Sequence, residues 1–335
     1  MIPHRRFPVE DPSQIGEVRR AAGSLASSLG FDDVAAGRVA LAVTELGTNL
    51  IKHVGPNRQA AILIGSSERR LEVLSLDQGP GMDLHRCLED GFSTFGSAST
   101  GLGAVRRQAD RFFGHSVPHG GTVLAACFES QVAAARRVVP ARCDAAISVA
   151  GLSLAAPGET VSGDSWSARS DGARHWLVLA DGLGHGVEAA RAADGACAAL
   201  HDVAPVSPAE LLQRMHLVTQ GSRGAAGTVA LLDQGAGEIR LAGAGNIGSR
   251  VLSGLVDRTL LPQHGTLGIR LHRVQEVQLP WPDHGILILH SDGITNRWTL
   301  PTTGGLLQAD PLVIAGWMLR EHLRGRDDAT VVVLK

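Results

Sequence analysis

Two sets of Asp-Gly segments, one in each half of the chain, constrain most strongly what this sequence can fold into. In the first half, Asp77-Gln-Gly-Pro-Gly81 follows an apolar stretch. In the second half, Asp181-Gly-Leu-Gly-His-Gly186 follows Trp176-Leu-Val-Leu-Ala180, and Ser291-Asp-Gly293 follows another apolar run. Short apolar runs bounded by Gly and Asp are typical of buried strands that end in a turn. The pattern therefore predicts carboxylates at strand ends in both halves of the fold.

The length of the chain indicates two domains. It has 335 residues, of which 44% are hydrophobic and 19% are charged, so each half can bury its own core. We predict an α+β protein with a first domain over 1–130, a linker over 131–143 that is rich in Ala, Arg and Val, and a second domain over 144–335.

The first domain is predicted to pack helices on one face of a mostly antiparallel sheet. Apolar residues at helical spacing indicate helices, and short apolar runs between turn residues indicate strands. In chain order we expect helices over 11–29 and 32–51, strands over 60–66 and 70–76, a helix over 102–112 and a strand over 122–128.

The second domain is predicted to be a β-sandwich flanked by helices, because strands predominate in it. The expected helices cover 187–200, 208–220 and 310–323. The expected strands cover 145–154, 173–180, 228–233, 238–244, 249–252, 274–279, 286–290 and 330–334.

The remaining bulk properties exclude several classes of protein. The formal net charge is -2 and the Arg residues are scattered, which argues against nucleic acid or an anionic membrane as partner. The four cysteines form no CxxC pair, which argues against a zinc site or a disulfide framework. The first ten residues lack the apolar region of a signal peptide, and no apolar run approaches the roughly 20 residues that span a bilayer. We therefore expect a cytoplasmic protein.

Glu45 and Asn49 are the first pair of candidate site residues. They lie four apart on a predicted helix, so their side chains share one face. A carboxylate and an amide placed this way can address Mg²⁺ and a water or hydroxyl near a phosphate. Taken alone, the pair is equally consistent with an exposed polar stripe.

Asp77 is the candidate residue for recognition of a base. At a strand end its carboxylate can accept a hydrogen bond from an exocyclic amine such as that of adenine, and Gly79 and Gly81 let the backbone approach a flat base. Thr122 opens the last predicted strand after Gly120-Gly121 and is expected to contact the base as well.

Thr100, Gly101 and Gly103 lead into a predicted helix, where free backbone N–H groups can bind phosphate oxygens. A single Gly-x-Gly is weak evidence for such a site, and each glycine pair alone can be a turn. The four elements in this order nevertheless favour an ATP site.

Residues 10–128 resemble the small serine/threonine kinases of the gyrase, Hsp90, histidine-kinase and MutL ATPase superfamily, with its Bergerat-type α/β sandwich. They are most similar to the RsbT-like switch kinases of bacterial partner-switching and stressosome pathways, and more distantly to the anti-sigma-factor kinases; Asp77-Gln-Gly-Pro-Gly-Met and Leu88-Glu-Asp-Gly-Phe-Ser-Thr94 carry the likeness. The resemblance implies that Asn49 coordinates Mg²⁺, that Asp77 contacts adenine and that Glu45 is the base for the partner's hydroxyl. It also implies a lid over 83–99.

The second set of carboxylates is suited to metal ions. Asp181 and Asp292 each follow an apolar strand, and Asp327 comes just before the final strand, so these side chains can converge although they are far apart in sequence. Hard oxygen ligands favour Mg²⁺ or Mn²⁺. Two such ions about 4 Å apart can activate a water for attack on phosphorus. Each Asp-Gly taken singly is more often a turn, and His185 is more often a structural residue than a catalytic one.

Residues 144–335 resemble the PPM-type metal-dependent serine/threonine phosphatases, particularly the SpoIIE and RsbX branch. In that family an Asn turn similar to Asn246 is structural, and helices such as 187–200 and 208–220 gate metal binding. Many relatives carry an acid where this chain has Ser167, which removes one expected metal contact. The resemblance implies the ligands Asp164, Asp181, the Gly182 carbonyl, Asp292 and Asp327, with Asp328 as an alternative to Asp327.

Together the two halves predict a regulator with opposed activities. The first domain would phosphorylate a STAS-domain protein with ATP and Mg²⁺, and the second would dephosphorylate a STAS-domain protein with two Mn²⁺ or Mg²⁺ ions. The STAS partner is an antagonist or scaffold; a sigma-factor regulator, a downstream signalling enzyme and a second copy of the chain are further expected partners. The alternatives are a phosphatase whose first domain only senses nucleotide, or one whose first domain binds a sigma factor or partner without kinase activity.

Overall fold

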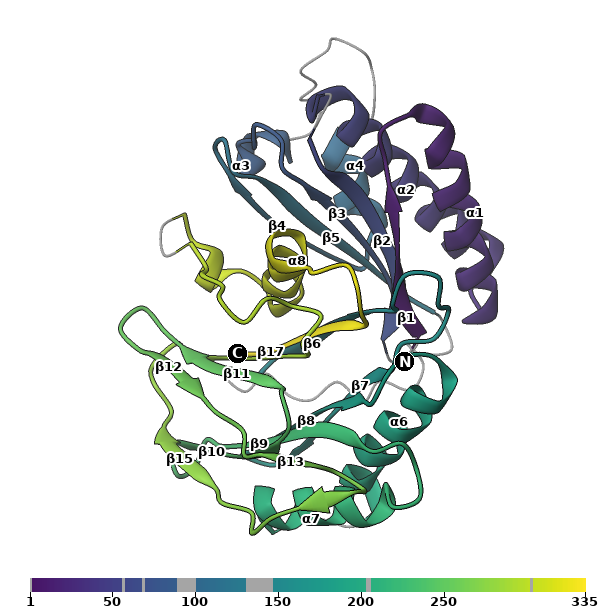
Figure 1. Cartoon of the computed structure of the whole chain (residues 1–335). Coiled ribbons are helices and arrows are strands. Elements are labelled where there is room, and N and C mark those ends of the chain that lie inside the picture. The colour runs from purple at the N-terminus through teal and green to yellow at the C-terminus, as the bar shows by residue number, and fades with distance from the viewer. Residues whose placement is uncertain are drawn as a thin grey trace. The chain divides into compact units, whose positions relative to one another are not determined.

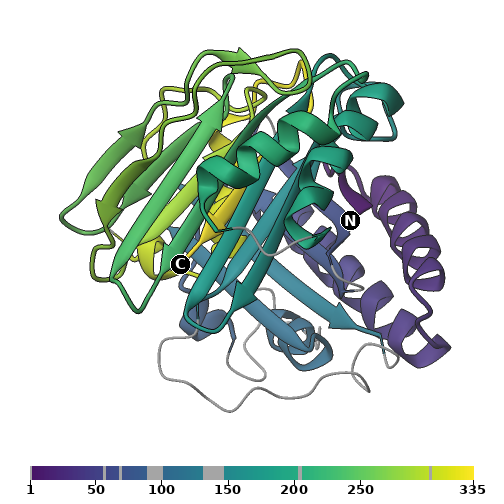
Figure 2. The same ribbon diagram turned by 90° about the horizontal axis from the view of Figure 1, so that it is seen from below.

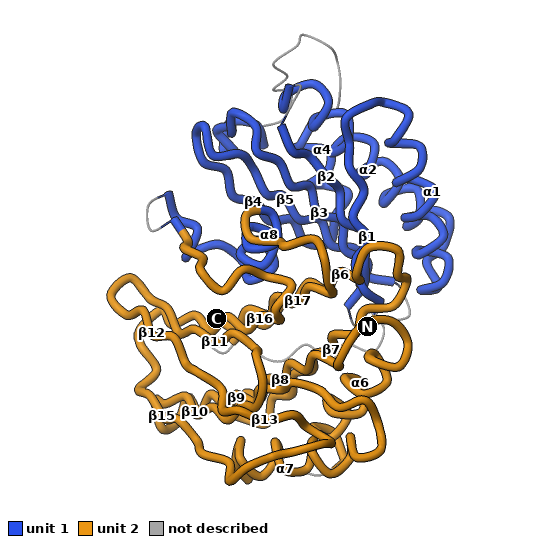
Figure 3. The backbone as a smooth tube through the Cα atoms, viewed as in Figure 1, with its two compact units in different colours: residues 1–144, 301–320 blue, residues 145–300, 321–335 orange. Residues whose placement is uncertain are grey.

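The computed structural model describes the chain from residue 2 onward, except for 56–57, 68–69, 89–100, 131–146, 203–205 and 302–303. The chain forms two compact units, which Figure 3 shows in different colours. Unit 1 comprises Met1–Asp144 and Pro301–Arg320, and unit 2 comprises Ala145–Leu300 and Glu321–Lys335. The predicted linker over 131–143 lies entirely outside the described residues.

Unit 1 contains an antiparallel sheet with the strand order β1-β2-β3-β5-β4 (Figure 1). Neighbouring side chains of a strand point to opposite faces of a sheet, so each of its faces can carry a separate layer of packing. The strands are β1 (Ile2–Pro8), β2 (Ala60–Ser67), β3 (Arg70–Asp77), β4 (Arg111–Val117) and β5 (Gly121–Glu129).

One face of this sheet is covered by the helices α1 (Pro12–Ser28), α2 (Asp33–His53) and α4 (Gly101–Gln108), next to the short α3 (Leu84–Cys87). Asp11 caps α1 through a capping box with Gln14, and the side chain of Asp32 caps α2 by accepting from the Ala35 amide. By length and composition alone α2 is long and apolar enough to cross a membrane, a property that core helices share. Its buried residues pack into the core of unit 1.

The predicted helix over 102–112 is wrong at its C-terminal end. The helix α4 ends at Gln108, and Arg111 begins the strand β4, which pairs with β5 along its whole length. Pairing with a neighbouring strand supplies backbone hydrogen bonds that local helix propensity does not outweigh. The strand β1 was also not expected from the sequence, because its two buried residues, His4 and Phe7, are three positions apart and show no alternation of period two.

The opposite face of the sheet carries α8 (Pro311–His322), whose residues up to Arg320 belong to unit 1. Gly316 allows close packing here: a Cβ atom on it would lie 3.0 Å from Val123 Cγ1 and 3.3 Å from the Cδ2 atoms of Leu74 and Leu76. Nothing in the sequence pattern indicates that this segment groups with the N-terminal half of the chain.

Unit 2 is built on two antiparallel sheets that share a core of apolar side chains. In the first sheet the strands of this unit follow the order β12 (Asp257–Leu260), β11 (Gly248–Leu252), β16 (Ile286–His290), β17 (Ala329–Leu334) and β6 (Val149–Leu154). The second has the order β15 (Val277–Pro280), β10 (Glu238–Ala244), β9 (Ala225–Asp233), β8 (Arg174–Gly182) and β7 (Asp164–Asp171). A short hairpin joins β13 (Gly265–Thr266) to β14 (Arg270–Leu271).

Two helices cover the outer face of the second sheet, as Figure 2 shows: α6 (Val187–Asp202) and α7 (Pro208–Val218). Their buried side chains form a second core with β8 and β9. A short 3₁₀ turn, η1 (Leu306–Gln308), precedes α8 in the chain. The predicted α+β class, with a β-sandwich flanked by helices in the second half, is confirmed.

Candidate nucleotide and metal sites

One pocket of unit 1 brings together four of the predicted site residues. Asn49, Asp77, Gly81 and Thr122 all line it, although they come from α2, from β3 and the turn after it, and from β5. The side chains that complete the lining are mainly apolar, as expected for a pocket that accepts a flat base. They are Leu50, His53, Val54, Ser75, Pro80, Met82 and Leu124.

Asp77 lines this pocket and is only 6% exposed. Burial raises the pKa of its carboxyl group, whereas the hydrogen bond from the Gly79 amide at 2.7 Å acts in the opposite direction. That bond fixes the orientation of Oδ1. A buried, oriented carboxyl group of this kind is a specific acceptor for an amine on a ligand.

The glycines around Asp77 are required by close backbone contacts. Gly81 has a φ of 74°, and a Cβ atom on it would lie 2.2 Å from the Val117 carbonyl oxygen. Gly121 has a φ of 80°, and its Cβ would lie 2.0 Å from the Asp77 carbonyl oxygen. Any side chain at either position would displace backbone, so the sequence keeps glycine there.

The helix α2 presents a polar stripe along this side of unit 1. Asn49 and His53 both line the pocket, and Glu45 lies one turn before Asn49 and is partly buried. His53 is not among the residues predicted from the sequence, although its spacing of four residues from Asn49 is a signal that indicates the same helix face. Burial lowers the pKa of His53.

The predicted phosphate-binding residues are only partly described. Gly101 and Gly103 lie in the first turn of α4, which packs against α2, and Gly101 has a φ of 52°. Thr100 lies outside the described residues, as does most of the predicted lid over 83–99. The described start of that lid is Asp83, which caps α3 by accepting from the Arg86 amide.

Arg320 is a residue of this site that no sequence signal indicated. It lies on α8, some 240 positions after Asp77 in the chain, and its Nη1 donates to the Asp77 carbonyl oxygen at 2.7 Å. Its Nη2 donates to the carbonyl oxygen of Gly120 at 2.8 Å. One guanidinium group therefore links the end of β3, which lines the pocket, to the turn before β5.

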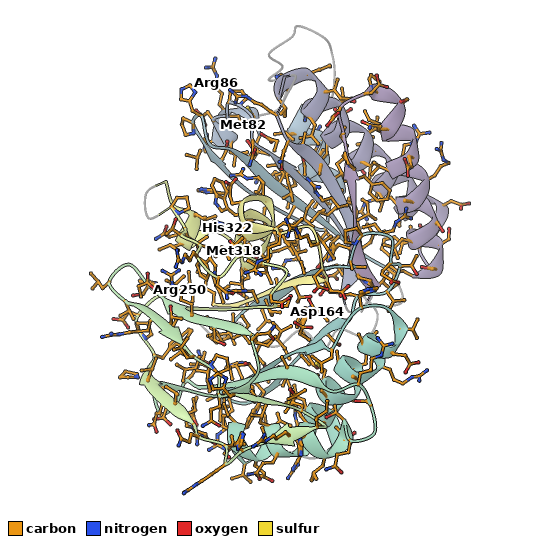
Figure 4. The ribbon with its side chains drawn as sticks, in the orientation of Figure 1. Met82, Arg86, Asp164, Arg250, Met318 and His322 are labelled. Atoms are coloured by element: carbon orange, nitrogen blue, oxygen red, sulfur yellow. The ribbon has the colours of Figure 1, made fainter. Side chains whose placement is uncertain are left out.

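In unit 2 the carboxylates of Asp164 and Asp181 come from adjacent strands. The two residues face each other directly in the pairing of β7 with β8, and Figure 4 labels Asp164. Burial raises the pKa of Asp164 to about 7. Burial, followed by the charge of Asp164 and other carboxylates, raises the pKa of Asp181 to about 9. The strand pairing thus places two acids where their charges repel each other.

Three further carboxylates act on Asp181 through their charge: Asp292, Asp327 and Asp328. Asp292 accepts a hydrogen bond of 2.8 Å from Asn246 Nδ2, which gives the predicted Asn turn an orienting role. Asp327 is exposed, whereas Asp328 is 3% exposed and accepts from the Ala156 amide at 2.8 Å. Both of the acids that the sequence left as alternatives therefore belong to one cluster.

Ser291 is the residue that orients Asp164, and our sequence analysis gave it no role of its own. It is fully buried, and its Oγ donates to Asp164 Oδ2 at 2.6 Å while accepting from the Thr330 amide at 2.9 Å. The other oxygen, Asp164 Oδ1, is buried without a hydrogen-bond partner among the residues that the structure describes. A buried carboxylate oxygen without a partner is costly unless a cation or a proton satisfies it.

Gly182 follows Asp181 at a point of very close packing. A Cβ atom on it would lie 2.1 Å from the Ala189 carbonyl oxygen of α6, and its amide donates to the Gly163 carbonyl oxygen at 3.0 Å. The first turn of α6 is therefore in close contact with the turn that follows Asp181.

The acidic cluster fits divalent cations by its chemistry. Its donors are hard oxygens and its five carboxylates repel one another. In the described part of the chain, one oxygen of Asp164 is buried without a partner. Within the described residues no three His, Cys, Asp or Glu side chains are already arranged to hold an ion. We therefore expect the carboxylates to draw together when cations bind.

The remaining predicted residues lie at the edge of this cluster. His185 is exposed, and its Nδ1 lies 2.7 Å from Glu159 Oε1. Ser167 Oγ lies 2.7 Å from His201 Nε2 of α6. Arg223 is a further polar residue here, with an Nη1 atom 3.3 Å from the Cβ position of Gly184. It offers a cation beside the Asp-Gly-Leu-Gly-His-Gly turn.

Comparison with protein families matches both halves of the chain. Residues 9–127 match the histidine kinase-like ATPase domain, and residues 171–335 match Stage II sporulation protein E (SpoIIE). The serine/threonine-protein kinase RsbT of Bacillus subtilis (strain 168) is 34% identical over 110 residues, which are 32% of this chain and 83% of that protein. The two matches occur in the predicted order.

Two solved structures match large parts of the chain. A structure from work on the bacterial stressosome, as a modular system adapted to control secondary messenger signalling, is 28% identical with a TM-score of 0.53; the match covers 57% of this chain and 100% of that one. The PP2C phosphatase domain of SpoIIE from Bacillus subtilis, with a fragment of its regulatory domain, is 15% identical with a TM-score of 0.49; that match covers 96% of this chain and 98% of the other.

Proposed function

The chain belongs to the RsbT family of histidine kinase-like ATPases and carries a SpoIIE-type phosphatase domain of the PPM class, and on this basis we propose that it switches one partner protein in both directions. Unit 1 transfers the γ-phosphoryl group of ATP to a Ser or Thr of a STAS-domain protein. Unit 2 hydrolyses phosphoserine or phosphothreonine on a STAS-domain protein.

The observation that supports kinase activity is the shared pocket of Asn49 and Asp77, with Glu45 one helical turn away. Asp77 accepts from the amine of adenine, and Asn49 holds the Mg²⁺ that accompanies the phosphates. Glu45 takes the proton of the partner's hydroxyl, whose oxygen bonds to the γ-phosphorus as the bond to the β-phosphate oxygen breaks and ADP leaves. Positioning of the reacting groups supplies most of the rate in such transfers.

The observation that supports phosphatase activity is the cluster of five carboxylates around Asp181. Asp164, Asp181, the Gly182 carbonyl, Asp292 and Asp327 would hold two Mn²⁺ or Mg²⁺ ions. Such ions would supply a nucleophilic water at neutral pH. Ser291 and Asn246 keep Asp164 and Asp292 in orientation through their hydrogen bonds.

A single partner for both units is favoured by effective concentration. A STAS-domain protein that leaves one active site stays near the other, because both are carried on one chain. The RsbT homology and the stressosome structure support a partner of the partner-switching kind.

The test uses the full-length protein with STAS-domain proteins encoded near its gene. Wild type is expected to transfer ³²P from [γ-³²P]ATP to a STAS partner with Mg²⁺, and to release phosphate from the phosphorylated partner with Mn²⁺. Glu45→Ala is expected to lose transfer while ADP binding persists, and Asp181→Asn to lose phosphate release only. Each variant is therefore the folding control for the other.

Two results would contradict the proposal. If wild type binds ADP and removes phosphate but never transfers it, unit 1 is a nucleotide sensor. If it captures a sigma factor or another partner with nucleotide present and transfers nothing, unit 1 is a binding module.

A further inference from the structure

His290 and Trp298 form a buried pair beside the acidic cluster of unit 2. His290 is the last residue of β16 and is 3% exposed, and Trp298, eight positions later, is 4% exposed. Trp298 Nε1 donates to His290 Nε2 at 3.0 Å, and the two rings meet edge-on with their centroids 6.0 Å apart. Neither side chain is among the proposed cation ligands.

The two contacts of the His290 ring define where its proton lies. An indole N–H can only donate, so Nε2 is the acceptor and carries no proton. The other nitrogen, Nδ1, lies 2.9 Å from the Ser291 carbonyl oxygen, which can only accept. His290 is therefore a neutral imidazole with its proton on Nδ1, and both of its nitrogens are bonded only in that tautomer.

The ring of His290 and its partner are held in place by two neighbouring strands. A Cβ atom on Gly248, which faces His290 in the pairing of β11 with β16, would lie 2.2 Å from His290 Nε2, so the ring lies against bare backbone. Arg250 of β11, labelled in Figure 4, donates from Nη1 to the Trp298 carbonyl oxygen at 2.8 Å, and its guanidinium carbon lies 4.4 Å from the Trp298 ring centroid. Asp257 of β12 accepts from Arg250 Nε at 2.6 Å.

The bond from His290 Nδ1 acts on the peptide group that joins Ser291 to Asp292. Because a peptide group is planar, the Ser291 carbonyl and the Asp292 amide turn together. The Ser291 amide donates to the Thr330 carbonyl oxygen at 3.0 Å, so the residue is held at both of its peptide groups. His290 thus helps to fix Ser291, whose Oγ orients Asp164. It also helps to fix the start of Asp292, a proposed cation ligand.

We propose that His290 is a positioning residue of the cation site, whose Nδ1–H holds the Ser291–Asp292 peptide, and that Trp298 anchors the imidazole ring through Nε2. The inference rests on the proposed function, because it assumes that the acidic cluster binds cations. A ring with its proton on Nε2 would turn a lone pair toward the Ser291 carbonyl oxygen, and the two lone pairs would repel. The peptide would lose its donor, and cations would meet a less ordered set of ligands.

The tautomer is tested first, in the metal-free protein. Full-length protein labelled with ¹⁵N at histidine is studied in EDTA at neutral pH by two-bond ¹H–¹⁵N correlation spectroscopy. The signals that His290→Asn lacks belong to His290. They are expected to show a neutral ring with its proton on Nδ1.

Two substitutions of His290 then separate positioning from packing. In His290→Asn the amide nitrogen is as many bonds from the backbone as Nδ1, so it can still donate to the Ser291 carbonyl oxygen. In His290→Gln the longer side chain can still accept from Trp298 but offers no donor at the Nδ1 position. By isothermal titration with Mn²⁺ we expect an affinity within about twofold of wild type for His290→Asn and a loss of roughly 3- to 10-fold for His290→Gln.

Trp298→Phe tests the anchor, and Trp166→Phe is its matched control. Trp298→Phe keeps an aromatic ring beside Arg250 but removes the bond to His290 Nε2, and Mn²⁺ affinity is expected to fall by about threefold. Within the described residues, the buried Nε1 of Trp166 in β7 has no hydrogen-bond partner, so the same substitution there removes no bond. Trp166→Phe is expected to bind Mn²⁺ as wild type does.

The inference is overturned if His290 carries its proton on Nε2, or if His290→Asn and His290→Gln bind Mn²⁺ with equal affinity. Wild-type affinity in Trp298→Phe would overturn the anchoring role of Trp298. All three results leave the proposed phosphatase standing, because wild type still binds Mn²⁺. A wild-type protein that binds no Mn²⁺ contradicts the proposed cation site and, with it, the inference.

Discussion

Asp164 and Asp181 lie directly opposite each other on β7 and β8, and the burial of both side chains raises the pKa values of both carboxyl groups. Without cations, the native protein keeps protons on this pair at a pH where an ordinary carboxyl group is ionised. Cations that bind there must displace those protons. The pair therefore links the stability of unit 2, its metal binding and the pH.

The first prediction concerns the metal-free protein. The native pKa values of about 7 and about 9 lie above the unfolded value of 3.8, so the native state binds more protons between them. Stability conferred by the protonated pair is fully present below pH 3.8 and is lost as pH rises through the native values. The melting temperature of unit 2 in EDTA is expected to fall by several degrees between pH 5.5 and pH 8.5.

Asp181→Asn is the control for this pH dependence. It removes one charge of the pair, so its melting temperature in EDTA should vary less with pH and should exceed that of wild type at pH 8.5. Mn²⁺ should stabilise wild type at pH 8.5 and not the variant. A steeper pH dependence in Asp181→Asn would show that other groups control the stability.

The second prediction concerns the buried Ser291. Ser291→Ala removes the hydrogen bond that orients Asp164 Oδ2 and frees the Thr330 amide. Loss of such an orienting partner typically costs 10- to 100-fold in metal affinity, and we expect a loss of about tenfold by isothermal titration with Mn²⁺. Ser170→Ala, on the same sheet but bonded to His175, should bind Mn²⁺ as wild type does.

The third prediction concerns the base-recognition residue. Asp77→Ala removes the acceptor for the adenine amine and the bond to the Gly79 amide, and ADP affinity should fall by at least about tenfold. Glu45→Gln should bind ADP with nearly the wild-type affinity, because Glu45 does not line the pocket. Equal losses in the two variants would argue that Asp77 acts through folding rather than through the base.

The fourth prediction concerns the packing of α8. Gly316→Val places a branched side chain where even a Cβ atom meets Val123 at 3.0 Å, and we expect a loss of about 1–3 kcal/mol in the free energy of unfolding. Gly23→Val is the matched substitution on α1, where nothing lies within 4 Å of a Cβ atom. It should be neutral or slightly stabilising, since valine has the higher helix propensity. Chemical denaturation followed by circular dichroism compares them.

Much of the fold was predictable because strand and helix patterns are local. The strands β10 and β16 have the predicted bounds, and the helices α2 and α6 differ from prediction by a few residues. The strand β4 was not predicted, because no strong turn signal separates its residues from the helix before it. Only its pairing with β5 shows that it is a strand. Pairing partners far apart in the chain leave no mark in a local pattern.

The candidate sites show the same division. Asp77 and Asp181 could be predicted as candidate site residues because a carboxylate after an apolar strand is a local signal. Ser291 was not predicted, because it precedes Asp292 in a motif in which only the Asp was interpreted. Its role follows from the hydrogen bond that orients the buried carboxyl group of Asp164. Arg320 could not be predicted from such local signals. Its two hydrogen-bond acceptors are main-chain carbonyl oxygens, which every residue has, so no residue type in the sequence marks them.

The grouping of Pro301–Arg320 with unit 1 has a consequence for how such a chain is inherited. The path passes from one unit to the other three times, after Asp144, after Leu300 and after Arg320. A gene fragment that encodes only the N-terminal half would therefore yield a sheet that lacks α8 on one face. It would also lack Arg320 and its hydrogen bonds to Asp77 and Gly120. A cut in the gene between the two halves would leave the remaining C-terminal piece with all of unit 2 and with a helix that belongs to unit 1.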